Sequence, residues 1–151
     1  MRLLAIAALA AALPAAAQDA ATPTPLDPIR CAATAATIGT VHDGLPQEAR
    51  GPLSDAAERS LTDLRAFALV AAEESECGLS QAEASEQLTA EAELRAAEAN
   101  DHITDGEDVA DVTGLLLDDL EACTLLYAEA GLGRLRQAVE DGDMTCGWTF
   151  D

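Results

Sequence analysis

The chain has 151 residues, enough for one domain, and carries 28 acidic against 8 basic residues with no lysine, for a formal net charge of −20. Such a surface repels nucleic acids and anionic lipid head groups, which proteins bind through lysine and arginine, and it attracts cations and basic peptides. Only 3% of the residues are aromatic, and alanine supplies much of the 49% hydrophobic fraction. Because a buried alanine removes little apolar area from water, we expect thin helix packing that needs covalent reinforcement.

The N-terminus has the three parts of a secretory signal peptide. Arg2 provides the positive start, residues 3–13 are apolar, and the alanines at 15–17 are the small residues that signal peptidase requires. The apolar stretch is far shorter than the roughly 20 residues of a membrane-spanning helix. We therefore expect residues 1–17 to be removed by cleavage near Ala17, leaving a periplasmic or secreted protein with no membrane insertion. An extended, proline-containing lead is expected over 18–27.

Two helices are predicted in the first half of the chain. Asp27 is a good N-cap with Pro28 at the first helical position, and this helix should continue to about His42. A second helix should begin near Pro52 and end at Gly78, because glycine readily takes the left-handed conformation that closes helices. Its apolar residues recur at steps of three and four: Leu53, Ala57, Leu61, Leu64, Ala68 and Ala71.

Two more long helices are indicated by repeated capping patterns. Ser80 and Glu83 have the spacing of a capping box and should open a helix that runs to about Ala99. Thr104 and Glu107 repeat the pattern and should open the fourth helix. That helix has the clearest apolar stripe in the chain: Val109, Val112, Leu116, Leu120, Cys123 and Tyr127.

A short helix over 134–140 should follow, after Gly131 and Gly133 close the fourth helix. No stretch shows the alternation typical of strands. The sequence thus predicts an all-α fold over 28–151: a single domain built as an up-and-down bundle of four main helices plus a short C-terminal helix.

The four cysteines, Cys31, Cys77, Cys123 and Cys146, are widely spaced and form no C-x-x-C pair. In an exported chain this pattern favours two structural disulfides over a redox or zinc site. The rise along the predicted helices places Cys31 and Cys123 at similar heights, with Cys77 and Cys146 near the opposite end. The favoured pairing is Cys31–Cys123 with Cys77–Cys146, and the second choice is Cys77–Cys123 with Cys31–Cys146.

No segment has the pattern of a catalytic, cofactor or metal site. The acidic stretch 101–108 resembles a calcium loop, but Ile103 and Val112 would occupy ligand positions of an EF-hand. The histidines, His42 and His102, lie near predicted helix ends, where solvated turn residues are common. Zincin, P-loop, nucleophile-elbow and dinucleotide-binding patterns do not occur. Neighbouring acids such as Asp118-Asp119 are expected to be exposed surface.

The C-terminal tail holds two of the four aromatic residues, Trp148 and Phe150. If Cys146 pairs with Cys77, these rings should plug the open end of the bundle. The alternative is a partner-facing tail, since tryptophan is enriched at interface hot spots.

The leading functional hypothesis is a non-enzymatic exported protein without a cofactor that binds a cationic protein or peptide. One alternative is an acid- or stress-responsive chaperone, because protonation of many carboxylates would collapse the net charge and loosen the bundle. Another is a weak divalent-cation binder. The simplest interpretation of the acidity alone is that it keeps an alanine-rich protein soluble.

Overall fold

The structure, a computed structural model, describes residues 26–150. The predicted signal peptide and nearly all of the predicted lead therefore lie outside the described residues. The five α-helices are α1 (Pro28–Gly44), α2 (Ser54–Glu74), α3 (Gln81–Thr104), α4 (Val109–Tyr127) and α5 (Leu132–Asp141), and the 3₁₀ turns are η1 (Gln47–Ala49), η2 (Gly51–Leu53) and η3 (Thr145–Gly147). No strand occurs within 26–150, and the predicted all-α class is confirmed.

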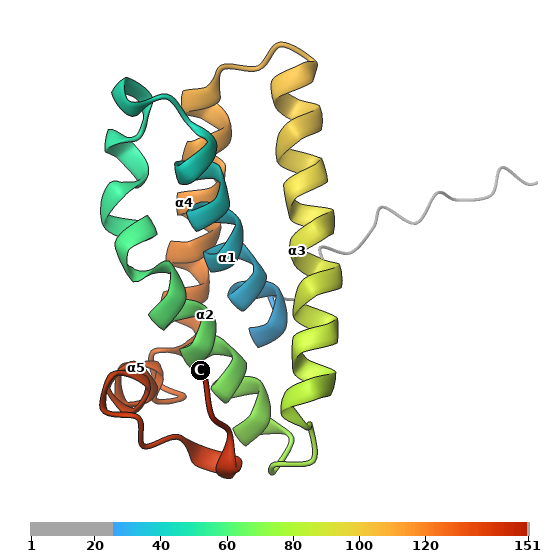
Figure 1. Cartoon of the computed structure of the whole chain (residues 1–151), viewed down its shortest axis with the longest axis vertical. Helices are drawn as coiled ribbons and strands as arrows, with labels where there is room; N and C mark the ends of the chain where they lie inside the picture. The colour runs from blue at the N-terminus through green and yellow to red at the C-terminus, as the bar shows by residue number, and fades with distance from the viewer. Residues whose placement is uncertain (1–25, 151) are drawn as a thin grey trace, which may run out of the picture.

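Helices α1 to α4 run alternately up and down, and α5 lies across the end of the bundle where α1 begins (Figure 1). Helix α1 occupies the middle and contacts α2, α3 and α4. Its small residues, Cys31, Ala32, Ala33 and Ala35, are completely buried, and the larger core side chains come mainly from the helices around it. Small side chains on α1 allow the close helix packing expected from the composition. None of the helices described over 26–150 is long and apolar enough to cross a bilayer.

Two of the predicted helix starts are confirmed by their caps. At α1, the Arg30 amide donates to Asp27 Oδ1 at 2.8 Å, with Pro28 at the first helical position. At α3, the Glu83 amide donates to Ser80 Oγ at 3.2 Å, and the Ser80 amide donates to Glu83 Oε2 at 3.0 Å. These reciprocal bonds complete the capping box.

The second predicted capping box is wrong. Helix α3 continues past Ala99 to Thr104, whose hydroxyl donates to the Asn100 carbonyl within the same helix at 2.8 Å. The cap of α4 is Asp108, which accepts from the Ala110 amide at 2.9 Å. Between the two helices the chain reverses through Gly106, at φ +91°, a conformation that glycine adopts without steric cost.

The glycines expected to close α2 and α4 do not close them. Helix α2 ends at Glu74, and the left-handed residues that follow are Glu76 and Cys77, with φ of 52° and 61°. The Cys77 amide donates to the Ala72 carbonyl at 2.8 Å. This bond satisfies a carbonyl in the last turn of α2, and the donor is Cys77 rather than Gly78. Gly131, at φ 87°, precedes α5 and serves as its N-cap, and Gly133 lies inside α5.

Both bridges of the favoured disulfide pairing are present. Cys31–Cys123 joins α1 to α4, with a Cα–Cα distance of 5.7 Å. Cys77–Cys146 joins the α2–α3 connection to the C-terminal tail, with a Cα–Cα distance of 5.4 Å. The pairing follows the heights of the cysteines in the bundle, as the helix lengths predicted.

Polar contacts also fix the position of the shorter elements. Asp63 on α2 is 1% exposed and accepts from Arg136 Nε on α5 at 2.6 Å. The Tyr127 hydroxyl donates to the Leu26 carbonyl at 2.8 Å and thereby holds the start of the described chain against α4. Because a buried carboxylate needs a partner, Asp63 ties α5 to one position on the bundle.

Candidate functional site

The C-terminal tail packs against α2 and α3. Trp148 is 6% exposed, and its ring meets Phe150 edge-on with the centroids 6.2 Å apart. The Arg65 guanidinium lies 5.1 Å from the centre of the Phe150 ring. A cavity of about 240 Å³ is lined by Trp148 and Phe150 of the tail and by side chains of α2 and α3, among them Leu61 and Leu64. Trp148 is thus a packing residue in this structure, and Phe150 is half-buried.

The acidic stretch 101–108 forms the end of α3 and the turn that follows. His102 Nδ1 lies 2.8 Å from Glu107 Oε1, and both side chains are exposed. His42 lies in the last turn of α1, and its Nδ1 is 3.2 Å from Asp43 Oδ1. Within the part of the chain that the structure describes, no group of three or more histidine, cysteine or acidic side chains is arranged to hold a metal ion.

One face of the described structure has an open groove of about 620 Å³. It lies between the first turn of α1, the last turn of α2 and the middle of α3. We call it the acidic groove because three carboxylates stand among its apolar side chains. The residues used below are Asp27, Ile29, Glu74, Leu79, Glu91 and Leu94.

The groove has an excess of negative charge. Asp27 is engaged as the cap of α1, whereas Glu74 is exposed and has no ion-pair partner among the described residues. One cation lines the groove, Arg30, whose Nε lies 3.8 Å from Glu91 Oε1. Burial, together with the charges of Glu74 and Asp27, raises the pKa of Tyr127 to about 12. The same carboxylates therefore act on a neighbouring titratable group.

Leu94 is the most exposed large apolar side chain of the groove, at 61%. Ile29 and Leu79 are half-buried in its walls and also pack against the core. An exposed leucine is ordinary when it stands alone, but here it adjoins other apolar side chains in a concave surface. The groove can therefore cover an apolar side chain and place a positive charge beside a carboxylate at once.

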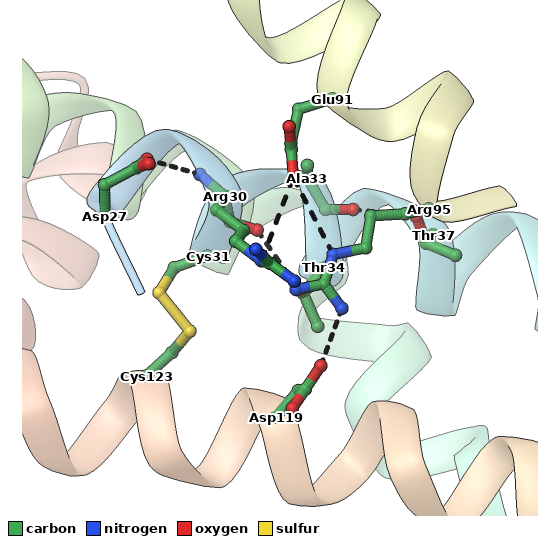
Figure 2. A network of polar contacts seen from close by, with 10 residues as sticks. All are labelled: Asp27, Arg30, Cys31, Ala33, Thr34, Thr37, Glu91, Arg95, Asp119 and Cys123. Atoms are coloured by element: carbon green, nitrogen blue, oxygen red, sulfur yellow. Dashed lines mark hydrogen bonds and ion pairs between the residues drawn. A yellow bond between two sulfur atoms is a disulfide. The ribbon is translucent and has the colours of Figure 1, made fainter. Parts of the chain in front are cut away.

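A cluster of two arginines and two carboxylates lies where α3 and α4 meet α1, and it shares Arg30 and Glu91 with the groove (Figure 2). Arg95 Nη1 donates to Asp119 Oδ2 at 2.6 Å. Glu91 Oε1 lies 4.0 Å from Arg95 Nε and 3.8 Å from Arg30 Nε, within ion-pair range but beyond hydrogen-bond distance. One glutamate oxygen thus lies near both guanidinium groups.

The guanidinium group of Arg95 is unusual for its burial. Its side chain is 6% exposed, and neither Nε nor Nη2 has a hydrogen-bond acceptor, nor does Arg30 Nε. Buried polar groups in folded proteins nearly always find partners, and an exception calls for an explanation such as a bound molecule. A cavity of about 220 Å³ between α3 and α4 is lined by both arginines.

The sequence alone did not identify this cluster. Asp118 and Asp119 were expected to be exposed surface; Asp118 is exposed, and Asp119, with its side chain 42% exposed, also pairs with Arg95, which the sequence did not indicate. The four-residue spacing of Glu91 and Arg95 was the one local signal, and such pairs are common on helix surfaces. No protein-family model, curated protein or solved structure matches this chain.

Proposed function

We propose that the protein is an exported, non-enzymatic binding protein whose acidic groove takes a basic, amphipathic segment of a partner protein or peptide. The export part is supported by the signal-like residues 1–17 and by two disulfides, which persist in oxidising compartments. The binding part is supported mainly by the composition of the acidic groove: apolar side chains surrounded by carboxylates in a concave surface.

The apolar and the basic side chains of the proposed ligand each match one feature of the groove. A leucine-sized side chain would cover Leu94 and Leu79, and removal of that apolar area from water favours binding. A lysine or arginine one turn away would approach Glu74, which has no basic partner among the described residues. The net charge of −20 would speed the encounter and make it sensitive to salt.

The test is calorimetric titration of the mature, oxidised protein with a synthetic amphipathic helix made of leucine and lysine. We expect saturable binding that weakens as salt rises. Glu74→Gln and Leu94→Asn should each weaken it by about threefold to tenfold, because each removes one of the two attractions.

Two matched variants distinguish the groove from general charge attraction. Glu48→Gln removes the same charge at η1, near the opposite end of the bundle, and Leu125→Asn removes a leucine on α4 that is 70% exposed. Both should leave the affinity unchanged. Equal losses from Glu48→Gln and Glu74→Gln would mean that the peptide senses only the net charge, and the groove proposal would then be wrong.

A further inference from the structure

We infer that the Cys77–Cys146 disulfide is a redox-sensitive switch whose reduction frees the C-terminal tail from α2 and α3 while the bundle stays folded. The two disulfides have different surroundings. Cys31 and Cys123 are 0% exposed in the core, whereas Cys77 is exposed and Cys146 is partly buried. A thiol reaches an exposed disulfide directly, but it reaches a buried one only when the fold opens. The inference does not depend on the proposed partner groove, because none of the residues used here lines that groove.

The backbone at both ends of this disulfide is in a costly conformation. The φ angles of Cys77 and Cys146 are 61° and 60°, and Glu76, beside Cys77, has a φ of 52°. Residues with a Cβ atom rarely adopt this left-handed region, because the Cβ atom crowds the backbone there. In addition, Thr145 Oγ1 is buried without a hydrogen-bond partner among the described residues. Reduction lets both segments relax, so it relieves local costs that the closed tail carries.

The tail covers apolar side chains of α2 and α3. Trp148 is 6% exposed, and the cavity of about 240 Å³ beside it is lined by both rings of the tail and by Leu61, Leu64 and other side chains of the two helices. The Gln81 side chain donates to the Thr149 carbonyl and accepts from the Thr149 amide. After reduction these non-covalent contacts remain, and the tail opens and closes as a local unit. The open form exposes the apolar surface to solvent.

The reductant is an external dithiol, and the reaction passes two electrons to the two cysteines. A thiolate of the dithiol attacks Sγ of Cys77, the more exposed cysteine, and the Cys146 sulfur leaves as a thiolate that takes up a proton. The second thiol of the reagent then attacks the reagent's own sulfur in the mixed disulfide, which releases Cys77 and oxidises the dithiol to a disulfide. Because Glu76 places a negative charge beside Cys77, a dithiol without carboxylates is the favoured reagent.

The test treats the oxidised protein with increasing dithiothreitol, and alkylation with mass spectrometry identifies the reduced cysteines. Cys77 and Cys146 should be reduced at least about tenfold faster than Cys31 and Cys123, with the circular dichroism of the helices retained. Trp148 is the single tryptophan of the chain and reports on the tail. Its quenching by acrylamide, and the binding of an apolar dye, should rise by about twofold or more on reduction. Hydroxyethyl disulfide, an uncharged oxidant, should re-form the bond and reverse both changes.

Variants separate the switch from general loosening of the fold. The Cys77→Ser, Cys146→Ser double variant should show the raised quenching and dye binding without dithiothreitol, and the concentration that reduces the tail disulfide should change neither. Gln81→Ala should raise quenching further in the reduced protein and leave it unchanged in the oxidised one. Gln137→Ala, which removes an exposed glutamine bonded to Asp141 on α5, should have no effect in either state.

Four results would each overturn the inference. They are reduction of Cys31–Cys123 at the same rate as the tail disulfide, loss of helix when only the tail disulfide is reduced, unchanged Trp148 quenching after its reduction, and failure of the bond to re-form in the oxidant.

Discussion

His102 and Glu107 show how one exposed contact makes stability depend on pH. The hydrogen bond to Glu107, and then the charge of that carboxylate, raise the pKa of His102 above its ordinary value. A histidine with a raised pKa in the folded state stabilises the fold fully below the pKa of the unfolded state, about 6.5. This stabilisation is lost as the pH rises through the higher pKa of the folded state.

We predict that Glu107→Gln lowers the pKa of His102 and removes this pH-dependent stability. The difference in unfolding free energy between the wild type and Glu107→Gln should be present at about pH 5.5 and should shrink as His102 deprotonates. NMR titration of the His102 ring and urea unfolding at several pH values measure the two effects. In a His102→Gln background the same substitution should show no such pH dependence, and a persistent one would assign the effect to another group.

At the scale of the helices, the cap of α3 is the clearest local determinant of structure. Ser80 accepts from the Glu83 amide, and Glu83 accepts from both the amide and the hydroxyl of Ser80. These bonds lower the pKa of Glu83, with the side-chain bond contributing most. The cap therefore stabilises the start of α3 most when Glu83 is ionised, and the benefit declines as the pH falls through the folded-state pKa.

We predict that Ser80→Ala destabilises the protein by about 1 kcal/mol at neutral pH, measured by urea unfolding. Ser85→Ala is the matched control, because Ser85 lies inside α3 on an exposed face. It should be neutral or slightly stabilising, since alanine is the better helix former. Equal losses from both substitutions would show that the hydroxyl at the cap has no special role.

Helix starts were more predictable from the sequence than helix ends, because the interactions that cap a helix start join residues close together in the sequence. The caps at Asp27 and Ser80 are hydrogen bonds between residues three apart, so the local sequence specifies them. At Thr104 the same local signal was overridden, because α3 continued until Gly106 could reverse the chain. The left-handed turn at Glu76 and Cys77 lies beside the disulfide that joins Cys77 to the tail. The residues near this turn in the sequence do not predict that disulfide.

The candidate sites were the least predictable part of the molecule. Arg30, Glu91, Arg95 and Asp119 come from three helices, and their meeting depends on how far each helix is rotated about its axis. Hydrophobic spacing predicts the buried face of each helix but does not say which polar residues at its border will meet. The disulfides could be ranked from sequence because position along a helix axis, unlike rotation, follows directly from residue count.

For the whole molecule, we predict that the two disulfides differ in what they stabilise. Cys31–Cys123 spans 92 residues of sequence and is buried in the core, and its replacement by two serines should cost several kcal/mol, of the order of 4. Cys77–Cys146 spans 69 residues and holds the tail. Its replacement should cost less and should expose Trp148 before the helices unfold.

Urea unfolding followed by both tryptophan fluorescence and circular dichroism tests this ranking. In the Cys77→Ser, Cys146→Ser double variant the fluorescence change should precede the loss of helix. Coincident transitions in that variant would show that the tail and the bundle unfold as one unit without the bridge.

The two disulfides also interleave along the chain. Cys77 lies between the bonded pair Cys31 and Cys123, and Cys123 lies between the bonded pair Cys77 and Cys146. If the chain is exported as proposed, translocation from the N-terminus brings Cys77 to the oxidising side before Cys123. The first bond open to a vectorial oxidase is therefore Cys31–Cys77, a bond absent from the finished protein. If that bond forms first, the finished pairing is reached only through thiol–disulfide exchange, and folding of the exported chain would then rely on an isomerase as well as an oxidant.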